Sequence, residues 1–342
     1  MKEKPKVFVG VSGGVDSSVA LALLKKEGYD VTGVFLKVWN PEWLPCSWRE
    51  ERRSAMRVCA VLDVPFMTLD CEAEYKKEVA DYMIREYSLG NIPNPDIFCN
   101  TYIKFGIFLK KALEMGADYV ATGHYARIID NQLAESKDKE KDQSYFLYTL
   151  TPEQLKRVLF PVGNLTKPEV RKLAKKFNLP TAEKKDSQGL CFIGKLDMKD
   201  FLSHYIPKKR GDVLNSSGEV IGYHDGAVFY AIGERHGFTI TKKTPNESRL
   251  FVVSKNIEKN TIMVADLKNK KKFSAKEITL KDFSYHGSTL VRIRYRQEKQ
   301  KCRVENNRII FEIPQNGVSI GQSAVLYEGE KVIGGGIIES VK

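Results

Sequence analysis

The sequence of 342 residues has no long apolar run. It contains no stretch of about 18 consecutive apolar residues, the length that a membrane-spanning helix needs. Its first residues, Met1 to Lys6, are charged and lack the apolar core of a secretion signal. We therefore expect a cytoplasmic protein with no membrane partner.

Closely paired cysteines are also missing. No two cysteines form a Cys-x-x-Cys pair, which argues against a zinc ribbon, and we expect no iron–sulfur cluster. Without a secretion signal, a disulfide scaffold is excluded as well. We expect most thiols to be inert and one or two to be reactive, with no role assigned to Cys46. The six cysteines are Cys46, Cys59, Cys71, Cys99, Cys191 and Cys302.

Acidic residues are too few to balance the basic ones. Lys and Arg number 55 against 43 Asp and Glu, a formal net charge of +12. Such an excess favours a polyanionic partner, because phosphate contacts require Lys and Arg, although a merely soluble basic protein has the same balance. The hydrophobic content of 42% is typical of a globular protein, and the length suits two or three domains.

The first half of the chain alternates strands with helices. Apolar runs at 7–11, 31–38, 65–69 and 118–122 predict buried strands, and the periodicity at 17–26, 50–62, 72–89, 102–113 and 170–177 predicts helices. This alternation predicts an α/β fold with a parallel sheet covered on both faces. Thr166 to Glu169 has the pattern of a capping box before the last of these helices.

After about residue 205 short strands dominate. Turn sequences at 215–218, 306–307, 314–317 and 328–329 separate these strands, and a lysine-rich stretch at 268–272 divides two β units. We expect three domains: an α/β domain at 1–204, a small β-rich domain at 205–268, and a carboxyl-terminal β-barrel at 269–342.

A glycine-rich loop follows the first strand. Ser12 to Ser18 reads SGGVDSS and leads directly into a helix. Glycines let backbone N–H groups approach an anion, and the helix amino terminus favours negative charge. Asp16 would repel phosphate, so we expect it to hold Mg²⁺. The loop has no lysine of the Walker type. It resembles the pyrophosphate loop of the ATP pyrophosphatases, whose members adenylate a carbonyl oxygen.

Two cysteines stand in unusual surroundings. Asp96 and Cys99 follow Pro95 with a spacing that places both on one helix face. A cysteine at a helix amino terminus is acidic and reactive, whereas a buried Cys99 beside a capping Asp96 would be inert. Cys191 lies in a glycine-bounded segment that suits either a functional loop or the core. Taken alone, neither cysteine is decisive.

Together the loop and both cysteine segments resemble the defining motifs of the bacterial and mitochondrial tRNA-specific 2-thiouridylases. The resemblance extends over nearly the whole chain. It includes GHYAR at 123–127, KDQSYFL at 141–147, LTKPEVR at 165–171 and GQSAV at 321–325.

This resemblance implies ATP-dependent thiolation of the wobble uridine of tRNA. Cys191 would carry a persulfide from a sulfur-relay protein or a cysteine desulfurase, Cys99 would cleave it, and Asp96 would serve as acid or base. The pair would end as a disulfide, or sulfide would be released. The residues implied to bind ATP are Gly10, Val11, Ser12, Gly13, Gly14, Val15, Asp16, Ser17, Leu36 and Gly123.

The resemblance also implies a set of tRNA contacts. A flipped-out base would meet Asn94, Pro95 and Asp96. His124, Lys141, Asp142 and Gln143 would line its approach, and Arg294, Tyr295 and Gln322 would contact tRNA further along the chain. Residues 290–296 alternate strictly, which predicts a strand with Arg292, Arg294 and Arg296 on one face. That face suits a phosphate backbone or, equally, solvent.

Two other functions are compatible with the loop. An amide-forming ligase of the same superfamily would need neither Cys99 nor Cys191. A non-catalytic RNA-binding protein could keep the loop without using ATP.

Overall fold

The chain packs as two compact units. The structure is a computed structural model that describes residues 4–45, 48–185, 197–242, 249–285, 287 and 290–342. Unit 1 comprises Met1–Asp81, Pro95–Leu196 and Glu328–Ile333. Unit 2 comprises Tyr82–Asn94, Asp197–Tyr327 and Gly334–Lys342. Packing thus divides the chain more coarsely than the three predicted domains and groups residues 82–94 with the β-rich part; the three-domain boundaries stay a prediction.

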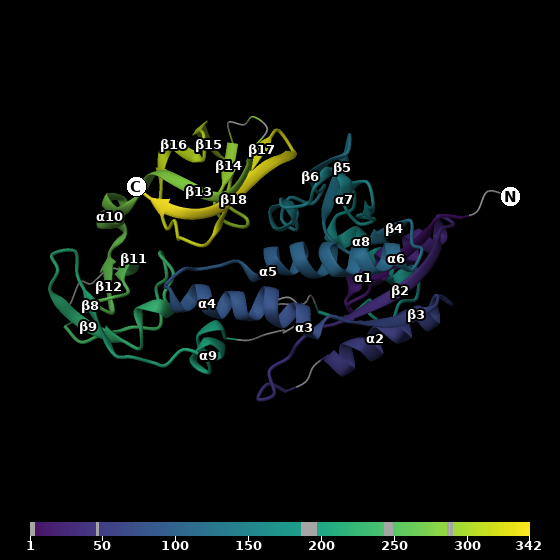
Figure 1. Ribbon diagram of the computed structural model, residues 1–342, viewed down its shortest axis with the longest axis horizontal. Coiled ribbons are helices and arrows are strands. Elements are labelled where there is room, and N and C mark those ends of the chain that lie inside the picture. Colours follow the sequence, from purple (N-terminus) through teal and green to yellow (C-terminus); the bar gives the residue numbers. More distant parts are fainter. Residues whose placement is uncertain (1–3, 46–47, 186–196, 243–248, 286, 288–289) are drawn as a thin grey trace. The chain divides into compact units, whose positions relative to one another are not determined.

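Unit 1 is built on a five-stranded parallel sheet (Figure 1). The first strand pairs with the second on one side and with the fourth on the other. The parallel sheet that the alternating pattern predicts is therefore confirmed. In spatial order its strands are β3 (Phe66–Asp70), β2 (Asp30–Lys37), β1 (Lys6–Gly10), β4 (Tyr119–Ala121) and β7 (Val158–Leu159).

Helices cover both faces of this sheet. Helices α1 (Val15–Lys26), α2 (Trp48–Val61) and α8 (Lys167–Lys176) share a core with Val7 and Val9 of β1. Side chains alternate along a strand, so Gly10 faces the other side, where Phe108 of α6 (Phe108–Glu114) approaches it.

The helix predicted at 102–113 begins earlier than expected. It starts with α5 (Pro95–Phe98), continues as a π-helical segment η2 (Cys99–Ile107) and ends with α6. Pro95 suits the first helical position because the first N–H of a helix needs no partner within it. The other elements of unit 1 are α3 (Glu72–Tyr75), π-helical η1 (Lys76–Asp81), β5 (Ala126–Ile129), β6 (Gln132–Glu135), η3 (Ser144–Leu147) and α7 (Pro152–Leu155).

The first part of unit 2 is a small sheet in the order β10-β9-β8-β12-β11. Its pairs are antiparallel except for β8 with β12. The turn predicted at 215–218 joins β8 to β9, and Gly218 has a φ of +84° there. The elements are α4 (Tyr82–Ser88), α9 (Met198–Ser203), β8 (Gly211–Leu214), β9 (Val220–His224), η4 (Ala227–Phe229), β10 (Thr239–Ile240), β11 (Phe251–Asn256) and β12 (Thr261–Ala265).

A closed β-barrel follows the lysine-rich stretch, which forms α10 (Leu267–Lys270) and η5 (Lys271–Phe273). The barrel closes because β13 pairs with both β16 and β18. The predicted carboxyl-terminal barrel is confirmed (Figure 1, light green and yellow). Its strands are β13 (Ala275–Tyr285), β14 (Leu290–Arg292), β15 (Gln300–Glu305), β16 (Arg308–Gln315), β17 (Ser323–Glu328) and β18 (Lys331–Val341).

The strand predicted across residues 290–296 is wrong beyond Arg292, where β14 ends. The chain then turns: the N–H of Gln297 donates to the carbonyl of Arg294, and Arg296 has a φ of +62°. Val291 and Ile293 are both buried, so the alternation is real, but it does not extend to a three-arginine face. The segment has no Gly, Pro, Asn or Asp to signal the turn.

Gly33 in β2 offers a test of the packing between sheet and helix. A methyl group there would lie 2.4 Å from the Sγ of Cys59 in α2. We expect Gly33→Ala to lower the free energy of unfolding by about 1–3 kcal/mol through overpacking. Cys59→Ala in the same chain should recover much of that loss. Urea denaturation of both single variants and the double variant measures the coupling; strictly additive effects would show that the two atoms do not compete for space.

Candidate functional site

The site lies where the order of the parallel strands reverses. β1 and β4 are neighbours in the sheet, and the chain continues from β1 to β2 on one side and from β4 to β7 on the other, which makes their carboxyl ends the topological switch point. The predicted loop follows β1, and Gly123 follows β4. A Cβ at Gly123 would lie 2.5 Å from the backbone N of Ser17, so the two segments touch. Leu36, buried near the carboxyl end of β2, lies on the same edge of the sheet.

The loop between β1 and α1 is folded around Gly13. This residue has a φ of +73°, and a Cβ on it would lie 2.4 Å from the carbonyl oxygen of Glu51. The carbonyl of Gly13 accepts hydrogen bonds from Lys184 Nζ at 2.9 Å and from Ser54 Oγ at 3.1 Å. With this carbonyl held by α2 and Lys184, the loop is fixed in a turn at Gly13 whose positive φ favours glycine.

The start of α1 is shaped by hydroxyl groups. Ser17 Oγ donates to the carbonyl of Gly14 at 3.2 Å and accepts from the N–H of Ser12 at 3.3 Å. Gly14 is the N-cap and has no side chain to cap the helix. The first amides of α1 therefore have no such acceptor in the described part of the chain, and the helix dipole adds partial positive charge.

Asp16 is engaged in an ion pair. Lys167 Nζ lies 2.7 Å and 2.8 Å from the two carboxylate oxygens, and the hydroxyl of Tyr125 donates to one of them at 2.9 Å. The Lys167 side chain is 12% exposed, so this pair is only weakly screened by water. A carboxylate that is already neutralised by an ammonium group does not fit the expected Mg²⁺ ligand, since the cation would have to displace Lys167.

The structure supplies the lysines that the loop sequence lacks. Lys167 is the first residue of α8 and Lys184 follows that helix; both reach the loop from more than a hundred residues away. The capping box predicted at Thr166 is confirmed: its N–H donates to Glu169 Oε2 at 2.6 Å. The LTKPEVR motif predicted a cap and formed part of the family resemblance, but no role was assigned to Lys167, the first residue of α8.

Asp96 and Cys99 lie on the helical run that begins at Pro95. Asp96 is half-buried in the first turn, whereas Cys99 has no exposed surface and opens the π-helical segment η2. Helix formation thus starts four residues before Cys99, not at it. Cys191 lies outside the described residues, so its expected pairing with Cys99 stays a prediction.

His124, expected near the tRNA, is an interior side chain with 8% exposure. Its Nδ1 lies 2.7 Å from Thr122 Oγ1, and its Nε2 lies 3.3 Å from Lys104 Nζ. Burial and, secondly, the charge of Lys104 hold the pKa of His124 well below its usual 6.5. Phe105 and Phe160 pack against the ring. The imidazole is therefore neutral.

Asp142 and Gln143, which were predicted to line the tRNA approach, make hydrogen bonds inside unit 1. Asp142 is buried and accepts from the N–H of Ser136 and the hydroxyl of Ser144, both at 2.9 Å. Burial raises the pKa of Asp142. Gln143 Oε1 accepts from the N–H of Tyr125 at 2.9 Å, beside the Asp16 pair. Lys141 is half-buried, as are Asn94 and Pro95.

The tRNA contacts predicted in unit 2 also have partners. Arg294 donates to the carbonyls of Ile232, at 2.8 Å, and of Gly317. Gln322 Nε2 donates to the carbonyl of Ile92 at 2.8 Å, and Tyr295 packs under the guanidinium of Arg296. Each has a structural contact within unit 2, and their contact with tRNA stays a prediction.

Three of the remaining thiols are buried and weakly acidic. Burial raises the pKa of Cys59 and of Cys302 to about 11, and that of Cys71 to about 12. The expectation that these cysteines are inert fits this environment, because the thiolate is the reactive form.

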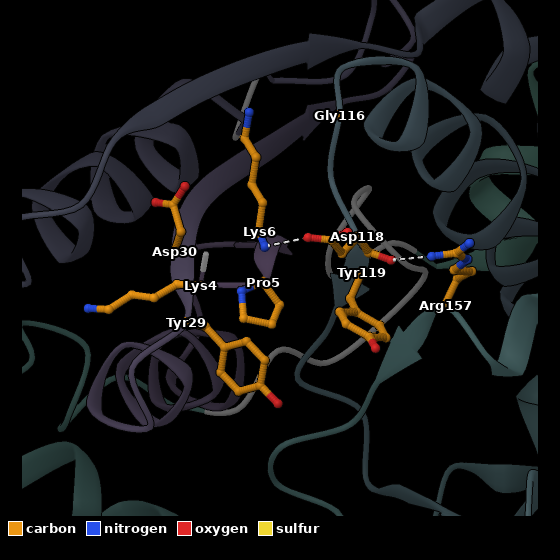
Figure 2. A pocket seen from close by; sticks show the side chains of 9 residues that line it. All are labelled: Lys4, Pro5, Lys6, Tyr29, Asp30, Gly116, Asp118, Tyr119 and Arg157. Carbon is orange, nitrogen blue, oxygen red and sulfur yellow. Dashed lines mark hydrogen bonds between the residues drawn. The ribbon is translucent and has the colours of Figure 1, made fainter. Parts of the chain in front are cut away.

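A hollow of about 820 Å³ lies at the opposite edge of the sheet (Figure 2). It is lined near the amino ends of β1, β2 and β4. Asp118 lies between Lys6, whose N–H donates to it at 2.8 Å, and Arg157, which contacts its carbonyl oxygen (Figure 2). Parallel sheets bind ligands at the carboxyl ends of their strands, so this hollow is not the candidate site.

Within the described residues, no cluster of three or more His, Cys, Asp and Glu side chains is arranged to hold a metal ion. Among the residues that the structure describes, no helix is long and apolar enough to cross a membrane.

Three family models match consecutive parts of the chain. The first, described as a tRNA methyl transferase HUP domain, matches residues 5–195. A tRNA methyl transferase PRC-barrel domain matches residues 199–266, and an aminomethyltransferase beta-barrel domain matches residues 268–338.

Curated relatives match over nearly their whole length. The chain is 44% identical to "tRNA-specific 2-thiouridylase MnmA 1" of Geobacillus kaustophilus, over 99% of this chain and 96% of that protein. It is 42% identical to the MnmA of Francisella philomiragia (97% and 99%). It is 41% identical to that of Bacillus subtilis (99% and 96%), and both proteins are named tRNA-specific 2-thiouridylases.

The thiol environments predict a selective pattern of alkylation. Treated with iodoacetamide at about pH 8, near the ordinary pKa of a thiol, the native protein should leave Cys59, Cys71 and Cys302 unmodified. Mass spectrometry of peptides locates the labels, and the same reaction in denaturant, where all six cysteines react, is the control. Label on any of the three in native protein would contradict their assigned burial.

Proposed function

The chain belongs to the tRNA-specific 2-thiouridylase family, and on that premise we propose that it uses ATP to replace the C2 oxygen of the wobble uridine of tRNA with sulfur. Its curated relatives of this name match it over nearly their whole length, and the chain is an enzyme of that family. The observation that best supports the proposal is the meeting of the glycine loop, Gly123 and Lys167 at the switch point of the sheet.

ATP would bind with its phosphates on the loop from Gly10 to Ser17. The amides at the start of α1 would donate to the phosphates, and Leu36 and Gly123 would contact the adenosine half. The backbone at Gly123 lies so close to Ser17 that any side chain at position 123 would overlap Ser17. We assign no metal ion to Asp16, because its carboxylate is already paired with Lys167.

Lys167 and Lys184 would provide the positive charge for the phosphates. Lys184 lies under the loop at the carbonyl of Gly13, and Lys167 is paired with Asp16. When phosphates arrive, Lys167 can share its charge between them and Asp16. Without Lys167, Asp16 would stand beside the phosphates as an uncompensated like charge.

Adenylation would make the uridine oxygen a leaving group. The C2 oxygen attacks the α-phosphorus, the bond from that phosphorus to the bridging oxygen breaks, and pyrophosphate leaves with the electron pair. A uridine carbonyl is a poor electrophile, and AMP is a far better leaving group than oxide. The phosphate loop serves this first half of the reaction.

Sulfur transfer would use Cys191, Cys99 and Asp96. The terminal sulfur of a Cys191 persulfide attacks C2, and AMP departs with the original oxygen. Cys99 thiolate then attacks the Sγ of Cys191, which releases thiouridine and leaves a Cys99–Cys191 disulfide for an external thiol to reduce. In the alternative order Cys99 first releases sulfide, which attacks C2. Asp96 would accept the proton of the persulfide.

The partners of this reaction are tRNA and a persulfide donor. The wobble base must leave the anticodon stack to reach the site. Asn94, Pro95 and Asp96 would meet it, Lys141 would stand on the approach, and the net charge of +12 supports binding of the phosphate backbone. Arg294, Tyr295 and Gln322 are proposed contacts of unit 2. A sulfur-relay protein or a cysteine desulfurase would supply the persulfide.

The reaction can be tested directly. With ATP, Mg²⁺, a persulfide donor and unmodified tRNA, the protein should form 2-thiouridine, detected by mass spectrometry of digested tRNA. Cys99→Ala, Cys191→Ala and Asp96→Ala should each lose turnover because each removes a required group. Cys59→Ala, a buried thiol outside the site, is the matched control and should retain it.

The failures separate the alternatives. Pyrophosphate release without thiouridine from the parent chain would favour an amide-forming ligase. Binding of tRNA with no use of ATP would favour a non-catalytic RNA-binding protein. Full turnover by Cys191→Ala would reject the persulfide route while leaving the nucleotide site intact.

Lys167 provides a second test, which concerns the binding of ATP and not the transfer of sulfur. Lys167→Met removes a charge-assisted contact and leaves Asp16 exposed to the phosphates, so the KM for ATP should rise about 10- to 100-fold. Lys172→Met, an exposed lysine on the same helix with the same change of net charge, is the control. Lys167→Met with Asp16→Asn should recover part of the loss. Equal KM values for the Lys167 and Lys172 variants would exclude this role of Lys167.

A further inference from the structure

Lys104 and His124 form a contact that the steps above do not use. Lys104 lies in the π-helical segment η2, and its Nζ is 3.3 Å from Nε2 of His124. The other ring nitrogen, Nδ1, is 2.7 Å from Thr122 Oγ1. The ring is buried against Phe105 and Phe160, so its orientation is fixed.

The hydrogen-bond pattern determines the state of the imidazole. An ammonium group can only donate, so Nε2 of His124 accepts and the single ring proton sits on Nδ1, from which it is donated to Thr122. A second positive charge on the ring would face Lys104 in a desolvated site. His124 therefore acts as a neutral acceptor that orients the ammonium of Lys104 without cancelling its charge.

The contact between Lys104 and His124 links the residues that follow β4, next to the phosphate loop, to the helical run that carries Asp96 and Cys99. Thr122 and His124 flank Gly123, whose backbone touches that of Ser17, and Thr122 lies 3.8 Å from where a Cβ of Gly10 would be. Lys104 is five residues after Cys99, which is the spacing of the hydrogen bonds in a π-helix, and helical side chains lean toward the amino terminus. A cation on the helix of Asp96 and Cys99 is thus held beside the strand end that borders the phosphate loop.

We propose that Lys104 is a catalytic residue of adenylation, binding the α-phosphate as it passes to the uridine, and that His124 is its positioning residue. The inference rests on the proposed function. In this step the α-phosphorus gains a bond to the C2 oxygen and loses its bond to pyrophosphate, and charge gathers on its equatorial oxygens. An oriented ammonium in a partly buried site stabilises that charge more than water does.

This assignment gives His124 a different role from a direct contact with tRNA. Asn and Gln distinguish the two roles. Asn keeps an amide near the position of Nδ1, so it can still pair with Thr122, but it is too short to reach Lys104. Gln places its amide oxygen near the position of Nε2, so it can still accept from Lys104.

The experiment measures a single turnover of pyrophosphate release from γ-labelled ATP, with unmodified tRNA and no sulfur donor. Omitting the donor removes the chemistry of both reactive cysteines from the signal. Lys104→Met should slow release about 100-fold at saturating ATP, and Lys104→Arg should keep part of the rate. Lys110→Met, an exposed lysine of α6, should behave as the parent chain does.

The His124 variants test whether His124 positions Lys104. His124→Asn should slow release about tenfold, the effect of a misplaced catalytic group, and His124→Gln should stay close to the parent rate. Affinity for tRNA, measured by filter binding, should be unchanged in both.

Three outcomes would overturn the inference. The first is pyrophosphate release by Lys104→Met as fast as by Lys110→Met. The second is equal slowing by both His124 variants. The third is loss of tRNA affinity by both His124 variants, which would make His124 a tRNA contact. A parent chain that releases no pyrophosphate with tRNA would instead refute the proposed function itself, and the inference with it.

Discussion

The close contact between the backbone at Gly123 and the first turn of α1 is the constraint on which the site depends. A side chain at that position would overlap the amide of Ser17, so the loops after β1 and β4 can meet only because the residue is glycine. The parallel sheet fixes both strands in adjacent positions, and their carboxyl ends therefore open at the same place. The groups proposed to hold the phosphates are built around this junction: the amides of α1, Lys167 from α8, and Lys104, which His124 orients beside Gly123.

Charge at the junction is distributed over distant parts of the sequence. A Walker loop carries its own lysine, whereas this loop carries an acid, and the cations come from α8 and the residues after it. The arrangement makes the loop dependent on the folding of the whole of unit 1. It also leaves Asp16 as the partner that keeps Lys167 in place before any phosphate is bound. A site of this kind uses an ion pair to hold a cation that a phosphate can later share.

Sequence patterns predicted the sheet, the barrel and the glycine-rich turn that leads into α1, because each rests on local chemistry. Strand periodicity, turn residues and a glycine-rich helix start are visible within a few residues of one another. Lys184, Lys104 and Tyr125 could not be found in this way, since their roles come from contacts between residues far apart in the chain. The strand predicted past Arg292 shows the converse failure. Its alternation was real for Val291 and Ile293, but a turn made by Arg296 at positive φ carried no signal in the residue types.

The π-helical form of the segment after Cys99 links these observations. An α-helix repeats every 3.6 residues, so residues five apart diverge around its axis. In a π-helix the i to i+5 hydrogen bonds widen each turn, so Cys99 and Lys104 lie closer to the same face than they would in an α-helix. The geometry is rarer than an α-helix, and such segments are frequent at functional sites. Here the same turns bury Asn100, Ile103 and Phe105, and this burial offsets the cost of the wider helix. The thiol proposed for sulfur transfer and the ammonium proposed for adenylation are thereby carried on one face of one rigid element, which lets a single base be presented to both halves of the reaction.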